Sequence, residues 1–546
     1  MSSLPRFEDA ARLHQAALAL LAPVLERARE TTASGARIDD HQVLTERVAY
    51  AATEERAARE CLAFWQSARA ADRAGEVEEA TCAVAVALLC ERLRARLAPL
   101  VDDLGLGDAA LERAYPAEIR ALWRRSANES ALRAIGLHAA RSRGRNATPL
   151  DETLEQVRDS VREFAENEVM PRAEQIHRRD ELIPEELIEK MAELGYFGLS
   201  IPEQYGGFEM GNLAMILTTE ELSRASLAGA GSLITRPEIL AKALLGGGTE
   251  EQKKLWLPRI ASGEKMVAIS VTEPDVGSDV ASVKCRAERR DDHWLVNGPK
   301  AWCTFAGRAE LIALLARTDP DASKAARGLS LFVVEKDRFP GHSFEMRQPG
   351  GGRIVGKADA TPGYRGMHSF TLNFEGYRVP AANLVGGDAG IGRGFQLQMA
   401  GFAAGRLQTG GRACGLAQAA LEKTAEYVVD RMQFGSPIAS YGLTQYHLGE
   451  MAAKLCAARA LTYAAARAFD EDERRAAPLA AQAKLLACDV AVEVTQQGQL
   501  LHGGWGYAEE YPISRYVVDA QVLPIFEGVK ATLELKVVGR SLLGGA

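Results

Sequence analysis

The sequence predicts an α+β protein, mostly α-helical, because regions of distinct character follow one another along its 546 residues. Residues 1 to about 133 are dominated by Ala, Leu, Arg and Glu, which favour helices, and contain few β-branched runs. A second helical region precedes Met266, where β-type segments begin, and helical sequence returns after residues 391–395. Because the strands are gathered in one region, the alternating order of a doubly wound α/β sheet is excluded.

Changes in composition divide the chain into segments. At roughly 150 residues per domain, a chain of this length has three to four domains. We predict a helical N-terminal extension over 1–138, a linker over 139–150, a helical domain over 151–265, a β-domain over 266–390 and a C-terminal helical domain over 391–546. The linker contains Gly, Asn, Pro and clustered Arg, and Asp151 after it is predicted to cap the next helix.

The β-domain is predicted from five segments with apolar alternation: VAISVTEP, DHWLVNGPKAWCTF, LIALLAR, LSLFVVE and SFTLNFEGYRV. Within the second of these, Asn297-Gly298 favours a hairpin turn. The Gly-rich stretch 347–366 lies between two strands and is predicted to be a long loop. Loops of such length inside a compact domain are usually functional.

Composition and charge exclude several classes of protein. With 47% apolar and 25% charged residues, the composition is that of a folded chain and excludes disorder. The sequence contains no apolar run of about 18 residues, so we expect no membrane-spanning helix. We see no secretory signal at the N-terminus, and a net charge of −8 argues against a nucleic-acid partner. The eight cysteines show no CxxC pair and no zinc-ligand spacing, which predicts a reducing, cytoplasmic setting and no metal site.

Two segments of the β-domain carry candidate binding residues. In VTEPDVGSD (271–279) a strand enters a turn containing Gly277 and Ser278, which offers backbone N–H groups and a hydroxyl to a cofactor or phosphate. In NGPKAWCTF (297–305) a strand carries Trp302 and Thr304. Each segment also has a purely structural interpretation. The first would be an ordinary turn, and the second a strand whose tryptophan packs in the core.

Two further segments lie in the C-terminal region. In DRMQFG (430–435) a helix ends at Arg431, which either neutralises the helix end or binds phosphate. In LPIFEGVKATLELKVVGRSLL (523–543), Glu527 lies between apolar residues and a glycine before an apolar-periodic helix. It is either a charge partner of the helix N-terminus or a catalytic base whose pKa burial raises.

In this order and spacing, the four segments resemble the acyl-CoA dehydrogenase family over residues 151–546. The family fold has a helical domain, a central β-domain and a C-terminal four-helix domain, which is the order already predicted. HGGWGYAEEYP (502–512) also matches the family segment whose glycines approach the adenosine diphosphate of FAD. The resemblance implies bound FAD and these cofactor contacts: Ile269, Val271, Thr272, Gly277, Ser278, Trp302, Thr304, Arg431, Phe434, Gly503 and Gly504.

The resemblance also implies a chemistry. Glu527 removes the α-proton of an acyl-CoA thioester while its backbone N–H and a flavin hydroxyl stabilise the enolate oxygen. Hydride leaves the β-carbon for flavin N5, and the electrons pass to an electron-transferring flavoprotein. Some members carry the base on the helix with the GR pair, one residue before the arginine. Here that residue is Gly405, before Arg406, so Glu527 has no rival.

Three positions depart from the family pattern. Val529 replaces the threonine of the usual EGT sequence, so a hydroxyl contact is missing. Phe526 replaces the usual tyrosine, and Leu500 stands where a flavin-contacting glutamine is common, with Gln499 beside it. These departures change details of the expected FAD contacts.

The N-terminal extension and the Gly-rich stretch are unusual in the family and indicate the subgroup that oxidises (2S)-methylsuccinyl-CoA to mesaconyl-CoA in the ethylmalonyl-CoA pathway. The second carboxylate of that substrate requires a cation, and the bidentate arginine is best suited. Predicted substrate contacts are Ser278, Arg236, Arg365, Arg406, Phe526 and Gly528, with Arg353 a further candidate.

Each of these arginines also has a structural interpretation. Arg412 lies about 240° round the helix from Arg406, so the two cannot face one ligand. The methyl branch needs a small cavity, for which Gly405 and Gly410 are plausible walls.

Other functions remain open at this stage. The same fold supports oxidases, which would release hydrogen peroxide, as well as dehydrogenases of other short or branched acyl-CoA thioesters. A non-catalytic helical assembly protein, working through the extension, would lack flavin. The extension either docks another protein or covers the helical face through which family members form tetramers, and we favour the second interpretation, which predicts a homodimer.

Overall fold

The computed structural model of the chain describes residues 4–145 and 148–544. Asn146 and Ala147 of the predicted linker lie outside these residues. The chain divides into two compact units: unit 1 joins Met1–Val157 to Thr409–Ala546, and unit 2 is Arg158–Gln408. Unit 1 is helical apart from a two-stranded hairpin, and unit 2 combines helices with a larger β-sheet, which confirms the predicted α+β, mainly helical fold.

Unit 1 contains the extension and most of the C-terminal helices. The extension has six helices: α1 (Phe7–Thr31), α2 (Gln42–Ala70), α3 (Glu76–Leu97), α4 (Asp108–Ala114), α5 (Ala117–Ser126) and α6 (Glu129–Arg141). The C-terminal part contributes α13 (Gly394–Asp430, from Thr409 onward), α14 (Gly442–Glu471), α15 (Glu473–His502), α16 (Gly504–Tyr507), α17 (Ile513–Ala520), α18 (Lys530–Thr532), the π-helical Leu533–Gly539 and α19 (Arg540–Leu543).

Small residues let the extension pack closely on the C-terminal helices. Helix α6 lies against α14, and α2 and α3 contact the same helix. A Cβ atom on Gly136 would lie 1.7 Å from the carbonyl oxygen of Gln445, and one on Gly449 would lie 2.0 Å from that of Leu132. The two backbones therefore approach to a distance that only glycine permits on each side.

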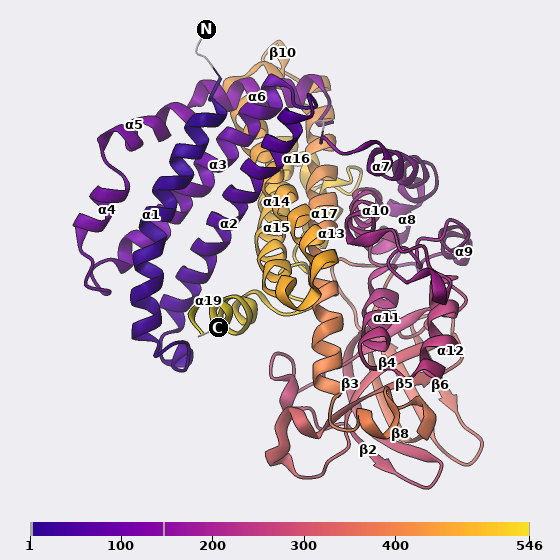
Figure 1. The fold of residues 1–546 in the computed structure, drawn as a ribbon. Helices are drawn as coiled ribbons and strands as arrows, with labels where there is room; N and C mark the ends of the chain where they lie inside the picture. Colours follow the sequence, from indigo (N-terminus) through magenta and orange to yellow (C-terminus); the bar gives the residue numbers. More distant parts are fainter. Residues whose placement is uncertain (1–3, 146–147, 545–546) are drawn as a thin grey trace. The chain divides into compact units, whose positions relative to one another are not determined.

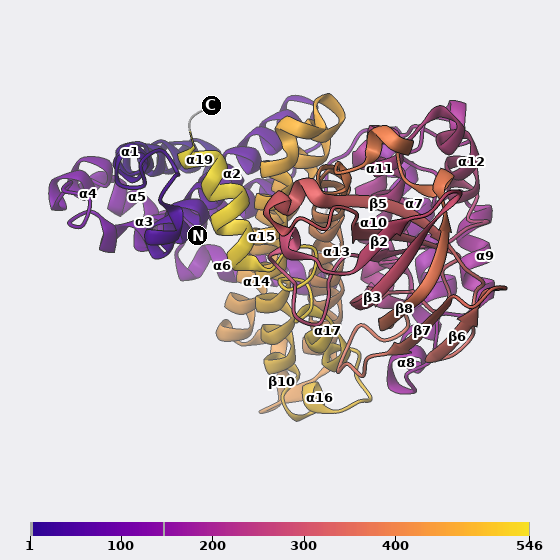
Figure 2. The same ribbon diagram turned by 90° about the horizontal axis from the view of Figure 1, so that it is seen from below.

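The extension also contacts the C-terminal end of the chain, which Figures 1 and 2 show beside α1 and α2. Arg29 Nε donates to the carbonyl oxygen of Leu542 at 2.9 Å, and Lys536 forms an ion pair with Asp39. Between these polar contacts lies an apolar cluster of Ala49, Tyr50, Ala481, Leu485, Leu533 and Val538. The first and last segments of the chain thus share one core.

Glu534 is buried at this contact, with 3% of its surface exposed. Burial, together with the nearby carboxylates of Glu46 and Asp489, raises the pKa of Glu534 to about 7. Because this carboxyl holds its proton in the folded protein between about pH 4.5 and 7 and loses it in the unfolded chain, stability falls as pH rises through that window.

We expect Glu534→Gln to raise the free energy of unfolding by about 2 kcal/mol at pH 8. Near pH 4.5 the variant should differ much less from the parent, because the carboxyl is then protonated in the folded protein and half protonated in the unfolded chain. Thermal unfolding at the two pH values measures this, with the exposed Glu112→Gln as control. Equal shifts at both pH values would contradict the expectation.

Unit 2 places helices around one eight-stranded sheet. Its helices are the end of α7 (Glu152–Phe164), α8 (Met170–Arg178), α9 (Glu185–Glu193), α10 (Gly211–Ala225), α11 (Thr235–Gly247), α12 (Glu250–Ala261) and the start of α13. Asp151 Oδ1 accepts from the Leu154 N–H at 2.9 Å, which confirms the predicted cap of α7.

The sheet has the strand order β1-β4-β2-β3-β8-β7-β6, with β5 paired to β4. Figure 2 labels the part of this order from β2 to β6. Its strands are β1 (Val267–Ser270), β2 (Arg286–Arg289), β3 (His293–Thr304), β4 (Leu311–Arg317), β5 (Leu329–Glu335), β6 (Ser343–Arg347), β7 (Arg353–Ala358) and β8 (Ser369–Pro380). The buried faces of β1, β4 and β5 pack against α11 and α12 through Leu244, Trp256, Leu257 and their neighbours.

The predicted hairpin turn at Asn297-Gly298 is wrong. Both residues lie inside β3, where the pairing with β8 shifts register between Val296 and Gly298. Gly298 has φ +134°, and a Cβ atom there would lie 2.9 Å from Cys285 Cα. Glycine is therefore required for a bulge and a close strand approach, and the turn between β2 and β3 instead closes with Arg290 N–H donating to His293 O at 2.8 Å.

The long loop predicted over 347–366 is also wrong in its first half. Gln348 N–H donates to Gly352 O at 2.7 Å, which makes a tight turn, and β7 follows at once. Strand β7 pairs on both sides, with β6 and β8. The alternating residues of RIVGKA thus outweigh the glycines around them.

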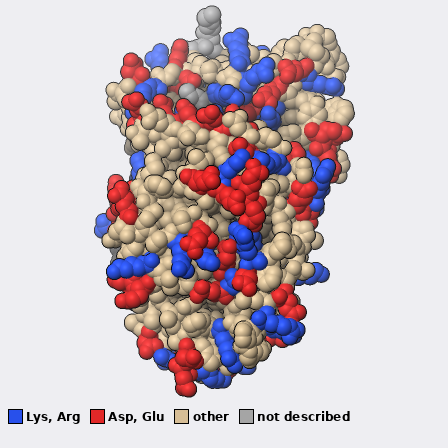
Figure 3. Space-filling view, turned by 90° about the vertical axis from the view of Figure 1, so that its right-hand side faces the viewer, with Lys and Arg blue, Asp and Glu red and all other residues tan. Residues whose placement is uncertain are grey.

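No helix in the described ranges is long and apolar enough to span a membrane. Lys and Arg side chains are intermixed with Asp and Glu side chains over the face displayed in Figure 3.

Candidate functional site

Glu527 lies on a short irregular segment between α17 and α18, in unit 1. It has φ +55° and the next residue, Gly528, has φ +100°. A left-handed conformation at a residue other than glycine costs about 1–3 kcal/mol unless its surroundings hold it. Here Lys484 Nζ on α15 donates to Gly528 O at 2.6 Å, and Lys530 N–H donates to Pro524 O at 3.0 Å. The loop therefore presents Glu527 in one fixed orientation.

The carboxylate of Glu527 is buried against α13. Arg412 Nη2 donates to Glu527 Oε1 at 2.9 Å and to Oε2 at 2.8 Å, and the Thr409 hydroxyl donates to Oε2. The Arg412 side chain is 0% exposed and that of Glu527 is 7% exposed. The ring of Phe526 covers the guanidinium, with its centroid 4.6 Å from Cζ. Arg412 and Glu527 thus form a buried, hydrogen-bonded ion pair.

The extension reaches the same segment through Tyr50 on α2. Its hydroxyl donates to Asp489 Oδ2 on α15, and Lys530 Nζ lies 2.5 Å from the same oxygen and 4.7 Å from the Tyr50 ring. Burial and the Asp489 carboxylate raise the pKa of Tyr50 well above its ordinary value. The extension thus helps to hold the residue three positions after Glu527.

In unit 2, the two predicted flavin segments lie side by side. Ala301 N–H donates to Thr272 O at 2.8 Å, which joins the end of β3 to the segment after β1. Trp302, next in the chain, has φ +57° and is 58% exposed. The core interpretation of this tryptophan is therefore wrong, and a large exposed ring on a sheet strand is available for stacking. Thr304 shares a hydrogen bond of 2.9 Å with Ser369.

A buried ion pair fixes the turn that carries Gly277 and Ser278. Lys300 Nζ donates to Val271 O at 2.8 Å and to Glu273 Oε1 at 3.1 Å. The other Glu273 contacts are the N–H groups of Lys284 at 2.8 Å and Cys285 at 2.7 Å. With both ends of the turn held, Gly277 and Ser278 remain exposed, and open space surrounds the Gly277 Cα.

In unit 2, Val271 is buried in an apolar cluster, with Ile269 packed against it. Four further predicted cofactor residues lie in unit 1 at exposed turns. Phe434, in the hairpin between β9 (Met432–Gln433) and β10 (Ser436–Pro437), has φ +51° and is 96% exposed. Arg431 directly follows α13, and Gly503 (φ +62°) and Gly504 follow α15, with open space around both glycines. Leu500 and Tyr507 are also largely exposed. Apolar side chains exposed in this way are typical of a binding surface.

Of the predicted arginines, two are engaged within unit 2. Arg236 is buried at the start of α11 and donates to Tyr364 Oη at 2.9 Å and to Ser232 O at 3.3 Å. Arg365 donates to the carbonyl oxygens of Thr361 and His177, at 3.1 and 3.2 Å.

The other two differ from each other in burial. Arg353 pairs with Glu375 and Glu345 on the sheet surface, which supports its structural interpretation. Arg406 is buried on α13, 9% exposed.

Sequence reasoning missed three of these features: the Arg412–Glu527 pair, the Lys300–Glu273 pair and the Tyr50–Asp489 contact. One signal was present for the first of them. Thr409 and Arg412 are three residues apart and therefore share a helix face, where they place two polar side chains together.

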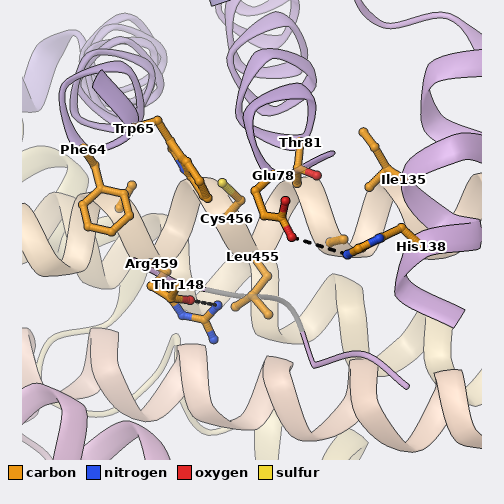
Figure 4. A pocket seen from close by; sticks show the side chains of 12 residues that line it. Phe64, Trp65, Glu78, Thr81, Ile135, His138, Thr148, Leu455, Cys456 and Arg459 are labelled. Carbon is orange, nitrogen blue, oxygen red and sulfur yellow. Dashed lines mark hydrogen bonds and ion pairs between the residues drawn. The ribbon is translucent and has the colours of Figure 1, made fainter. Parts of the chain in front are cut away.

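Two other clusters contain neither Glu527 nor the predicted flavin segments. A pocket in unit 1, between the extension and α14, is lined by Trp65, Cys456 and their neighbours, with Glu78 3.4 Å from His138 (Figure 4). In unit 2, ligand atoms of Asp180, His342 and His368 lie within 4.8 Å of one another, but the Arg365 guanidinium, 3.4 Å from Asp180, already supplies a positive charge there.

Family models match successive parts of the chain: the acyl-CoA dehydrogenase N-terminal domain over 151–264, the middle domain over 268–377 and the C-terminal domain over 392–543. The chain belongs to the acyl-CoA dehydrogenase family and is an FAD-dependent oxidoreductase. It is similar to (2S)-methylsuccinyl-CoA dehydrogenase of Cereibacter sphaeroides, with 38% identity over 518 residues, 93% of this chain and 92% of that protein. Because this coverage includes most of residues 1–138, the similarity extends into the extension.

The fold is similar to solved structures of the same family. Butyryl-CoA dehydrogenase from Megasphaera elsdenii is 30% identical with a TM-score of 0.66, covering 73% of this chain and 100% of that chain. A glutaryl-CoA dehydrogenase in complex with glutaryl-CoA is 32% identical with a TM-score of 0.65, covering 72% and 95%.

The residues present fit a flavin. Trp302 offers an exposed aromatic face on a rigid strand, and the turn at Gly277 and Ser278 offers exposed backbone and a hydroxyl without a side chain in the way. An exposed aromatic face is suited to packing on a flavin ring. Exposed backbone N–H groups and a hydroxyl are suited to binding a phosphate.

Proposed function

We propose that the protein oxidises (2S)-methylsuccinyl-CoA to mesaconyl-CoA, with Glu527 as the base that removes the α-proton. The observation that carries this proposal is the buried carboxylate of Glu527 beside a buried guanidinium, because an anion-binding group at the base suits an acidic acyl chain. The similarity over 93% of the chain, extension included, to an enzyme named for this substrate supports it.

The chain's own residues account for the proton transfer. The rigid loop aims the Glu527 carboxylate, and its backbone N–H is suited to donate to the thioester oxygen, where negative charge develops as the α-proton leaves. When bound, the flavin would accept the hydride from the β-carbon. Phe526 and Gly528 flank the base, and Ser278 offers a hydroxyl to the CoA portion.

We propose that FAD contacts the residues predicted from the family pattern. In unit 2 these are Ile269, Val271, Thr272, Gly277, Ser278, Trp302 and Thr304. In unit 1 they are Arg431, Phe434, Gly503 and Gly504, whose exposure supports a role in binding. The electrons then pass to an electron-transferring flavoprotein in the cytoplasm.

The second carboxylate of the substrate needs a cation. Arg236, Arg365 and Arg406 are the candidates predicted from the sequence. Arg236 and Arg365 already donate to groups of the fold, so using either would cost existing hydrogen bonds. Arg406 is buried beside Gly405 and occupies the position of the arginine that family members share.

We propose further that the protein is a homodimer. The extension covers α14 through α2, α3 and α6, and a helix face covered in this way is no longer free to pack against a second dimer. Light scattering should give a mass of about 118 kDa, twice the 59.0 kDa of the chain. A mass near four times that of the chain would contradict the dimer.

Anaerobic titration of the purified flavoprotein tests the function. We expect (2S)-methylsuccinyl-CoA to bleach the flavin absorbance, while succinyl-CoA and butyryl-CoA do so slowly or not at all. Bleaching by butyryl-CoA alone would contradict the proposed substrate, and rapid hydrogen peroxide formation in air would indicate an oxidase instead.

A further inference from the structure

The loop that carries Glu527 is closed by Lys530. The backbone N–H of Lys530 donates to Pro524 O at 3.0 Å, so the two ends of the loop are tied together with Glu527 between them. The loop needs this tie, because Glu527 has φ +55°, and left-handed backbone at a residue with a side chain relaxes unless its surroundings hold it. A contact that fixes Lys530 therefore also fixes the direction in which the Glu527 carboxylate points.

Two side chains of α15 hold this loop. Lys484 Nζ donates to Gly528 O at 2.6 Å, and Asp489 Oδ2 lies 2.5 Å from Lys530 Nζ. The second contact is an ion pair whose side chains are 23% and 38% exposed. Ion pairs that are open to water contribute little on their own, because solvent and salt screen their charges. The pair of Asp489 and Lys530 needs a further contact to hold the loop in one position.

The N-terminal extension supplies that contact through Tyr50 on α2. The Tyr50 hydroxyl donates to the same Oδ2 atom of Asp489, and Lys530 Nζ lies 4.7 Å from the centroid of the Tyr50 ring. Tyr50 is 2% exposed and belongs to the apolar cluster that joins the two ends of the chain. A hydrogen bond to a carboxylate is stronger than one between neutral groups, and the ring face attracts the ammonium group. Tyr50 thus contacts both members of the ion pair.

Tyr50 is itself fixed by other residues of the extension. Arg96 Cζ on α3 lies 4.2 Å from the centroid of the Tyr50 ring. The Arg96 guanidinium makes two hydrogen bonds to the carboxylate of Glu54, at 3.2 and 3.3 Å, and Glu54 is 1% exposed. Tyr50 and Glu54 are four residues apart and so share a face of α2. The ring, the guanidinium and the carboxylate therefore form one packed group of the extension.

Taking Glu527 as the base, as in the proposed function, we infer that Tyr50 is a positioning residue for proton removal, through which the extension holds the base in place. Tyr50 acts through Asp489 and Lys530 rather than by contact with the reacting atoms. The extension thereby gains a role in the reaction besides the covering of α14. This role has a large effect on the rate, since a displacement of about 1 Å lowers a rate by up to about 10²-fold.

A merely structural role for Tyr50 predicts a different result. If the hydroxyl only stabilises the packing of the extension, its loss lowers the melting temperature and leaves the reaction of the folded enzyme unchanged. Tyr115 provides the matched case, because it is also buried in the extension, 4% exposed, and its hydroxyl donates to Cys90 O at 3.1 Å. That hydrogen bond joins two residues of the extension and does not involve the loop of Glu527.

The experiment measures anaerobic flavin reduction by (2S)-methylsuccinyl-CoA in the full-length holoenzyme and its variants Tyr50→Phe, Lys530→Met and Tyr115→Phe. Tyr50→Phe keeps the ring and loses only the hydroxyl. We expect it to lower the limiting rate at saturating substrate about tenfold, with the half-saturating concentration and the flavin content within about twofold of the parent. Tyr115→Phe should keep the parent rate, even where its melting temperature falls as far.

A double variant tests the route of this effect. Because Tyr50 acts on the loop through Lys530, Tyr50→Phe should lower the limiting rate little further once Lys530→Met is present. Effects that multiply in the double variant would overturn the inference. So would a parent rate in Tyr50→Phe, or equal losses of rate in Tyr50→Phe and Tyr115→Phe. If Tyr50→Phe folds poorly, Lys530→Met decides from the side of the loop, and a parent rate in that variant overturns the inference.

The outcomes separate this inference from the proposed function. If another acyl-CoA reduces the parent enzyme and (2S)-methylsuccinyl-CoA does not, the proposed substrate fails, and the variants are compared with that thioester instead. If no acyl-CoA reduces the parent, or if Glu527→Gln keeps the parent rate, the proposed function fails and the inference fails with it. If the parent is reduced and Tyr50→Phe keeps its limiting rate, the inference alone is overturned.

Discussion

Glu527→Gln is expected to lower the rate of flavin reduction by (2S)-methylsuccinyl-CoA by about 10³-fold or more. The amide keeps the size of the side chain and can still accept from Arg412 and Thr409, but it cannot accept the α-proton. Stopped-flow reduction under anaerobic conditions, expressed per bound flavin, measures the effect. Expression per flavin is needed because the substitution also removes the counter-charge of the buried Arg412.

The matched control is Glu534→Gln, seven residues further along the chain. It likewise neutralises a buried carboxylate of the C-terminal segment, but one that contacts the extension side of unit 1. The parent rate is expected for this variant. A similar loss of the flavin reduction rate in both variants would mean that charge in this segment matters only for folding. A mild loss of that rate in Glu527→Gln would mean that another residue is the base.

Lys300→Met is expected to have the largest effect on stability, a loss of about 3–5 kcal/mol in the free energy of unfolding. Lys300 is 0% exposed and Glu273 is 5% exposed, so the substitution leaves a buried carboxylate without its cation. Because Glu273 also holds the N–H groups of Lys284 and Cys285, we expect the turn at Gly277 and Ser278 to loosen. Flavin content after purification should therefore fall together with the melting temperature.

Arg289→Met provides the comparison for this prediction. Arg289 pairs with Asp388 on the surface of the same unit, where the two side chains are 48% and 76% exposed. Such a pair contributes about 0–1 kcal/mol, so the melting temperature and flavin content should stay close to those of the parent. Equal effects of the two substitutions would contradict the role given to the buried pair.

Local patterns predicted the fold class, which the structure confirms, and supplied the candidate site residues. The change from helical to alternating periodicity located the sheet, and the spacing of four short segments indicated Glu527, Trp302 and the Gly277 turn. These signals are local because each depends on residues within one strand, turn or helix.

Contacts between distant residues could not be predicted in the same way. Arg412 and Glu527 are 115 residues apart, and helix geometry compares Arg412 only with other residues of its own helix. The prediction of a turn at Asn297-Gly298 was wrong because tertiary structure overrode the local preference of these residues. The glycine is required inside a strand, where Cys285 approaches it closely. Strand β7 was missed because the glycines around RIVGKA favour a loop, whereas the pairing of this segment with β6 and β8 stabilises a strand.

The shared core of the two chain ends has a consequence for biosynthesis. Arg29 and Leu542 are 513 residues apart, and Tyr50 and Asp489 are 439 apart, so the extension leaves the ribosome long before its partners exist. At about 5–20 residues per second, roughly 20–100 s pass before the matching helices are translated. During that time the apolar faces of α2 and α3 are exposed to chaperones and proteases, and any nascent chain that stops short of the last helices cannot complete the domain that was made first.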